Sequence, residues 1–106
     1  ITLDVNHVMH YYIKYDQIIQ IEFTEALSQG HHVRQFHNIA KVARRKLRQL
    51  EISNRLDDLR VPPGNHLEAL KGDRSGQYSI RINDQWRICF CWTNGGADNV
   101  EIVDYH

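Results

Sequence analysis

Three protonatable side chains close this chain, and they are the first candidates for chemistry. Asp104, Tyr105 and His106 follow one another at the carboxyl end. Histidine exchanges a proton near neutral pH, aspartate accepts one, and tyrosine offers both a ring and a hydroxyl group. Such a set suits acid–base work, but a chain end is often frayed when nothing holds it. The tail therefore needs neighbouring elements that position it.

The segment before the tail predicts a three-stranded antiparallel meander. Apolar and polar residues alternate over 77–82 and again over 86–92, which is the period of half-buried strands. Residues 83–85 have the length of a hairpin loop, and the turn at 93–99 leads into a last strand at 100–103.

A three-residue hairpin loop places Arg81 directly across from Arg87, on the face away from the apolar side chains. Two opposed guanidinium groups cost roughly a few tenths to 1 kcal/mol. An anion between them would offset this cost, and the planar fork of arginine suits phosphate. The alternative is that both point into solvent or pair with Asp73, Asp84 or Glu101. The hairpin alone leaves both interpretations open.

A basic amphipathic helix is predicted over 39–50, with Asn38 as its N-cap. Apolar residues fall on one side of this helix and cationic residues on the rest. The cationic side is either a solvated face or a surface for RNA phosphates, for which binding would depend steeply on salt. The candidate RNA-binding residues on it are Lys41, Arg44, Arg45 and Arg48.

The remaining N-terminal elements complete the predicted fold. The β-branched content of 17–23 favours a first strand at the edge of the sheet, followed by a helical turn at 24–27. Ser53 caps a predicted short helix over 54–59. These elements predict an α+β fold, in which a small antiparallel β-sheet packs against two helices from the N-terminal half.

Length and charge indicate one small domain without a general attraction to nucleic acid. The chain has 106 residues, with 13 basic and 13 acidic side chains. Any RNA contact must therefore come from a local patch. We treat residues 1–16 as an N-terminal extension of unknown role and residues 17–106 as the single domain.

Cysteine and histidine usage argues against disulfides and metals. Cys89 and Cys91 lie two apart on one strand face, where a bridge is geometrically poor, which favours reduced thiols and a cytoplasmic location. Three histidines cluster in a polar loop, namely His31, His32 and His37. They are better explained as exposed loop residues than as a zinc site. No apolar run approaches the roughly 18 residues of a membrane span, and no leader pattern is present.

Three motifs follow one another along the last third of the chain, namely Leu70-Lys71-Gly72-Asp73, Trp86-Arg87 and the terminal Asp104-Tyr105-His106. Together they resemble the motifs of HigB-type toxins of bacterial toxin–antitoxin systems, within the RelE/ParE superfamily. The resemblance is strongest from Pro62 onward, and residues 81–87 and 100–106 look closest to the GraT-type branch. It implies a RelE/ParE-like fold and a ribosome-dependent messenger-RNA endonuclease that needs no metal or cofactor and inhibits translation. The implied partners are a HigA-type helix-turn-helix antitoxin, the ribosome and messenger RNA.

The resemblance also implies a catalytic set, made of Lys71, Arg87, Asp104, Tyr105 and His106, with Arg81 as a further phosphate-binding residue. One position departs from the pattern, because many HigB-type toxins have His-Pro-Leu-Lys where this chain has Glu68-Ala69-Leu70-Lys71.

Two other functions stay open. One is a non-enzymatic toxin of the ParE kind that poisons gyrase. The other is a degenerate toxin that acts mainly in antitoxin binding and operon autoregulation. The clustered acid–base groups favour the enzyme, because a pure binder needs none.

Overall fold

The computed structural model describes residues 15–105, so most of the predicted extension and His106 lie outside the described residues. Two helices come first, α2 (Tyr15–Ser28) and α3 (Ala40–Ile52), joined by the 3₁₀-helix η1 (Arg34–Ile39). Two 3₁₀ turns follow, η2 (Leu56–Arg60) and η3 (Pro63–Asn65). The sheet is antiparallel, in the order β1 (Glu68–Ala69), β2 (Tyr78–Arg81), β3 (Trp86–Thr93), β4 (Gly96–Asp104). A further turn, η4 (Gly72–Arg74), connects β1 to β2.

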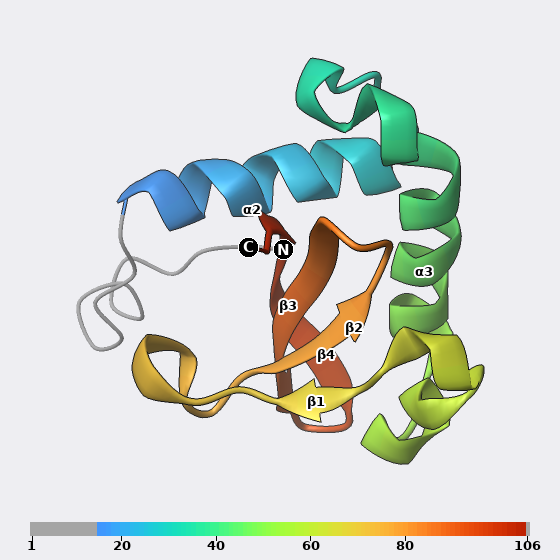
Figure 1. Ribbon diagram of the computed structural model, residues 1–106, viewed down its shortest axis with the longest axis vertical. Coiled ribbons are helices and arrows are strands. Elements are labelled where there is room, and N and C mark those ends of the chain that lie inside the picture. Colours follow the sequence, from blue (N-terminus) through green and yellow to red (C-terminus); the bar gives the residue numbers. More distant parts are fainter. Residues whose placement is uncertain (1–14, 106) are drawn as a thin grey trace.

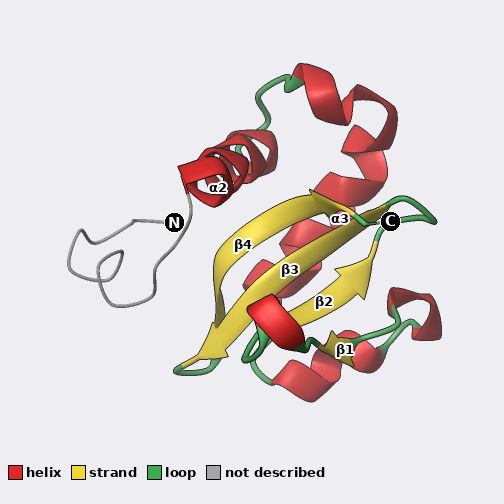
Figure 2. Cartoon of the chain, turned by 60° about the vertical axis from the view of Figure 1, so that its left-hand side comes forward, coloured by secondary structure: helices red, strands yellow, loops and turns green. Residues whose placement is uncertain are grey.

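The helices cover one face of the sheet, which confirms the predicted α+β fold. Figure 1 shows α2 and α3 wrapping around the sheet, and Figure 2 shows the η4 turn on the side away from α3. Between helices and sheet lies one core, which buries Leu27, Phe36, Ala43, Leu47, Leu59, Ile80, Ile88, Phe90 and Ile102. Each large side chain buried there contributes about 1.5–3 kcal/mol. No helix in the described range is long and apolar enough to cross a membrane.

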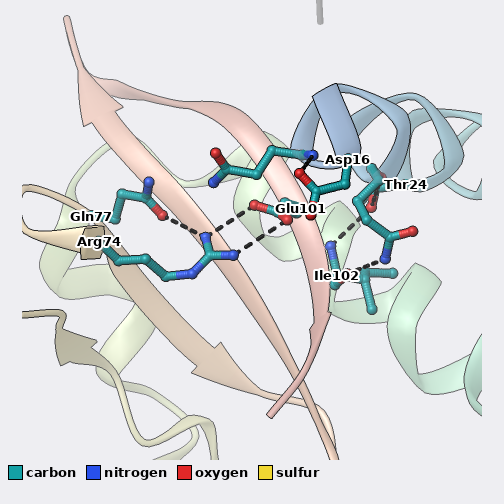
Figure 3. Close-up of polar contacts among 8 residues, drawn as sticks. Asp16, Thr24, Arg74, Gln77, Glu101 and Ile102 are labelled. Atoms are coloured by element: carbon teal, nitrogen blue, oxygen red, sulfur yellow. Dashed lines mark hydrogen bonds and ion pairs between the residues drawn. The ribbon is translucent and has the colours of Figure 1, made fainter. Parts of the chain in front are cut away.

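The predicted first strand over 17–23 is wrong, because this segment lies within helix α2. Polar side chains of α2 bind the backbone of the edge strand β4 (Figure 3): the Thr24 hydroxyl accepts from the Ile102 N–H at 2.9 Å, and the Gln20 amide donates to the Ile102 carbonyl at 3.0 Å. An unpaired sheet edge needs such a cover. The helix therefore takes the place at the sheet edge that the sequence assigned to a strand, and this tertiary contact overrides β propensity.

Two predicted caps are also wrong, although the basic helix itself is confirmed. Asn38 lies inside η1, and Ile39 takes the N-cap position of α3 without a side-chain hydrogen bond. Ser53 ends α3 rather than starting a helix, since its N–H donates to the Gln49 carbonyl at 3.1 Å. The segment after it forms the 3₁₀-helix η2 instead of an α-helix, with the Asp58 carboxylate accepting from the Arg55 N–H at 3.1 Å.

The hairpin register is confirmed. The Ile82 N–H donates to the Trp86 carbonyl at 2.9 Å, and Arg81 pairs with Arg87. The next turn is tighter than predicted, because β4 already begins at Gly96. Its two central residues, Asn94 and Gly95, have φ angles of 52° and 77°, as a two-residue hairpin turn with a matching twist requires.

Candidate functional site

A cleft of about 300 Å³ opens beside the β2–β3 hairpin. Strand alternation places Arg81, Arg87 and Tyr105 on the sheet face that the two α-helices leave free. We call this hollow the arginine cleft; it is lined by His66, Glu68, Arg81, Asn83, Asp84, Arg87 and Tyr105. Cations, carboxylates, an imidazole and a phenol thus converge on one place.

Arg87 is the buried centre of the arginine cleft. Its Nε donates to the Ser79 hydroxyl at 2.8 Å, and its Nη2 donates to the His66 carbonyl at 2.8 Å. A Glu68 carboxylate oxygen lies 3.8 Å from the same Nη2. Two neutral acceptors therefore fix the plane of the guanidinium group, while among residues 15–105 its one ion-pair partner is the half-exposed Glu68 carboxylate.

The structure shows which side chain balances the charge of Arg81. It forms an ion pair with Asp84 in the hairpin loop, as one of the two interpretations foresaw. The Asp84 side chain is 98% exposed, so the pair contributes little to stability. An entering anion can therefore compete with Asp84 for Arg81 at small cost.

The carboxyl tail is tied to the hairpin as far as Tyr105. The Gln85 amide donates to the Asp104 carboxylate at 3.1 Å, and the Gln85 carbonyl accepts from the Tyr105 N–H at 2.6 Å. The Tyr105 ring centroid lies 5.5 Å from the guanidinium carbon of Arg87, within the range of a cation–π contact. The described part of the tail is therefore held beside the arginine cleft, and His106 follows it outside the described residues.

The other predicted site residues lie elsewhere. Lys71 is exposed just before η4 and does not line the arginine cleft. Arg44 donates to the Leu27 carbonyl at 3.1 Å and to the His31 carbonyl at 3.0 Å, which ties the end of α2 to α3. The exposed cations on α3 recur at positions i, i+4 and i+7, so they share one helix face: Lys41, Arg45 and Arg48.

A buried ion pair holds the loop that carries Lys71. Arg74 donates to both carboxylate oxygens of Glu101, at 3.0 and 3.3 Å, and to the Gln77 amide oxygen at 3.0 Å (Figure 3). Glu101 therefore pairs with Arg74 and not with either arginine of the hairpin. Because this contact is bidentate and shielded from solvent, it pins η4 onto the sheet.

No pattern in the sequence indicated that His66 lines the arginine cleft, and Glu68 stood out only as a departure from the family pattern. Both lie at or beside β1, whose two residues are exposed and too few to show alternation. The one signal is the glycine at 64 after two prolines, which marks a turn but not its direction. Within residues 15–105, no group of three or more His, Cys, Asp or Glu residues is arranged to hold a metal ion.

Cys89 supplies a prediction about alkaline pH. Both cysteines are free, and burial raises the pKa of the Cys89 thiol from 9.0 to about 11, against the opposing charge of Arg74. The folded state therefore holds this proton more tightly than the unfolded state does. The resulting stability is fully present below pH 9 and is lost as the pH rises towards 11.

We expect the free energy of unfolding to fall by about 2 kcal/mol more in the parent protein than in Cys89→Ser between pH 8.5 and 11. Urea unfolding of both proteins at each pH measures this difference. The contributions of titrating residues that both proteins share cancel in the comparison. Parallel pH profiles for the two proteins would contradict the prediction.

Comparison with known proteins finds a matching family model and similar curated proteins. A family model described as "RelE-like toxin of type II toxin-antitoxin system HigB" matches residues 28–106. Over 52% of this chain and 58% of the relative, the sequence is 47% identical to Toxin HigB-1 of Vibrio cholerae. It is 41% identical to an uncharacterized protein of Haemophilus influenzae, over 59% of this chain and 62% of that protein.

A third relative is named Endoribonuclease HigB, from Proteus vulgaris, and is 48% identical over 38% of this chain and 44% of that protein. The chain thus spans about half the length of the curated relatives that it matches. The family model, by contrast, covers well over half of this chain. The chain therefore belongs to the HigB family of RelE-like toxins from type II toxin–antitoxin systems.

Proposed function

We propose that this chain is a toxin of the GraT-like branch that cleaves messenger RNA on the translating ribosome and so inhibits translation. The observation that carries the proposal is the Tyr105 ring 5.5 Å from the fixed guanidinium group of Arg87, at the edge of an open cleft. This arrangement offers a stacking surface for a base beside a cation for its phosphate. One relative is itself named an endoribonuclease.

RNA cleavage here would proceed by attack of a ribose 2′-hydroxyl on the adjacent phosphorus. The attacking hydroxyl must lose a proton, charge develops on the phosphoryl oxygens, and the departing 5′-oxygen must gain a proton. Arg87 and Arg81 hold the phosphoryl oxygens as their charge develops. Asp104 and His106 are the proposed groups for orientation and proton transfer, and Tyr105 stacks on a base. Lys71 lies outside the arginine cleft and is proposed as a further cation for the phosphate.

Helix α3 supplies the proposed contact with the ribosome. The exposed cations at 41, 45 and 48 form one stripe that suits ribosomal RNA phosphates, and Arg44 supports this surface by anchoring α3 to α2. The proposed regulator is a HigA-type helix-turn-helix antitoxin, and the proposed location of both is the cytoplasm. No metal or cofactor enters the proposed mechanism.

Cleavage mapping on translating ribosomes tests the proposal. We expect discrete cuts in messenger RNA with the parent protein and loss of these cuts with His106→Ala. Inhibition of DNA supercoiling with intact messages would instead assign the chain to the gyrase-poisoning class. Antitoxin binding without either activity would identify a degenerate toxin.

Glu68 supplies a further prediction for this reaction. Its carboxylate lies 3.8 Å from Arg87 in the arginine cleft, where it can take up a proton beside a bound phosphate. We expect Glu68→Gln, which keeps the size of the side chain, to lower the cleavage rate about 100-fold with little change in KM.

Single-turnover cleavage of programmed ribosomes separates these two parameters. Glu22→Gln removes an exposed carboxylate from α2 and is the control for net charge. If Glu68→Gln instead bound the programmed ribosome more tightly at an unchanged rate, Glu68 would only balance the charge of Arg87.

A further inference from the structure

Lys46 is a buried cation for which the proposed function gives no role. It lies on α3 with 8% of its surface exposed, and its Nζ donates to the Asn65 amide oxygen at 2.7 Å. Within residues 15–105 it makes no ion pair. Burial lowers the pKa of Lys46, and the positive charges of Arg45, Arg81 and Arg87 lower it further. Lys46 therefore lies in a positive field that includes both arginines of the arginine cleft.

Asn65 connects this lysine to the backbone around the site. The side chain is fully buried, and its amide nitrogen donates to the Leu59 carbonyl at 3.1 Å and to the Gln49 amide oxygen at 3.1 Å. Its oxygen is then directed to Lys46. Since both ends of the amide are engaged, Asn65 has one orientation, and it holds the η3 turn against α3.

The next residue, His66, connects the fixed turn at Asn65 to Arg87. His66 has a left-handed backbone with φ 45°, a conformation that a non-glycine residue adopts only when its surroundings hold it there. Its carbonyl accepts the hydrogen bond from Arg87 Nη2 at 2.8 Å. The orientation of this acceptor therefore depends on the fixed turn at Asn65.

We propose that Lys46 is a positioning residue for Arg87. Its ammonium group orients Asn65, Asn65 holds the turn that presents the His66 carbonyl, and this carbonyl fixes the guanidinium plane of Arg87. The charge of Lys46 also strengthens anion binding in the arginine cleft. This second effect rests on the proposed function, while the positioning itself does not.

Two substitutions at Lys46 separate its hydrogen bond from its charge. Lys46→Met removes both, whereas Lys46→Gln keeps a donor for Asn65 without the charge. The readouts are the NMR signal of the Arg87 Nε–H group, assigned by its loss in Arg87→Lys, and the dissociation constant for inorganic phosphate. Arg34→Met removes an exposed positive charge outside the site and is the control.

We expect Lys46→Met to shift the Arg87 signal and to weaken phosphate binding about tenfold. Lys46→Gln should restore the signal but not the affinity, and Arg34→Met should change neither. A folded Lys46→Met protein with the parent's Arg87 signal overturns the proposal, as does a Lys46→Gln protein that fails to restore it. If Lys46→Met does not fold, Lys46→Gln decides: weaker phosphate binding with the parent's signal supports the proposal, a shifted signal overturns the positioning role, and unchanged affinity overturns the effect of the charge.

If the parent protein binds no phosphate, a shifted Arg87 signal in Lys46→Met would still support the positioning role of Lys46. The same result would count against the arginine cleft as a phosphate site. Failure of this inference and failure of the proposed function are therefore distinguishable.

Discussion

Replacing Arg87 by lysine is expected to lower the rate of the proposed messenger-RNA cleavage by about 10²–10³-fold, or roughly 3–4 kcal/mol of transition-state stabilisation. Lysine keeps the positive charge but lacks the planar fork. It cannot bind the Ser79 hydroxyl and the His66 carbonyl while also facing a phosphate. The loss should therefore be nearly as large for Arg87→Lys as for Arg87→Gln. Single-turnover cleavage on translating ribosomes measures both.

Arg81→Lys is the matched comparison, since Arg81 lies directly across the hairpin from Arg87. Arg81 is more exposed and pairs with a carboxylate that is almost fully solvated, so its fork is less constrained. We expect a rate loss of about tenfold or less from this substitution. Urea unfolding of each variant shows whether the fold is kept. A folded Arg87→Lys protein that cleaves at the parent's rate would exclude Arg87 as the geometric centre of the site.

The β2–β3 hairpin and its register were predictable because their signals are local. Period-two alternation set the strands, and a three-residue polar loop placed Arg81 across from Arg87. The β3–β4 register, which the sequence analysis did not specify, places Tyr105 two positions beyond the partner of Arg87, which is Val103. The contact between Tyr105 and Arg87 follows from that geometry. The turn predicted over 93–99 is longer than the turn in the structure, so the alternation alone did not predict this contact.

The helix at the sheet edge was not predictable, because its cause is a contact far away in the chain. Thr24 and Gln20 bind the backbone of Ile102, 78 and 82 residues later. The helix is also only weakly amphipathic, with Phe23 and Tyr15 left exposed, so helical periodicity does not stand out. Its β-branched residues then point to a strand.

The burial of two charged side chains, Lys46 and Glu101, was not predictable either. Lys46 stands among four other cations on one helix, which is the pattern of a solvated face, yet it is buried against Asn65. Glu101 alternates with apolar residues along β4, as an exposed strand residue would, yet η4 covers it. Burial of a charge depends on which loop folds over it, and loops carry the weakest sequence signal.

Removing Arg74 is expected to destabilise the fold by about 3–5 kcal/mol. Arg74→Met leaves the Glu101 carboxylate, whose side chain is 7% exposed, buried without its partner. Glu101→Leu should cost less, since Arg74 is 24% exposed and can turn towards solvent. The double variant replaces both charges by apolar groups and should recover most of the loss. Urea unfolding of the four proteins gives the coupling energy between the two side chains.

Arg60 and Asp57 form the matched control pair. Their atoms are also 3.0 Å apart, but both side chains are more than 60% exposed. The same double-mutant cycle there should give a coupling energy of about 1 kcal/mol or less. Equal coupling in the two cycles would mean that the Arg74–Glu101 pair gains nothing from burial. In that case η4, and Lys71 beside it, would be held on the sheet by packing alone.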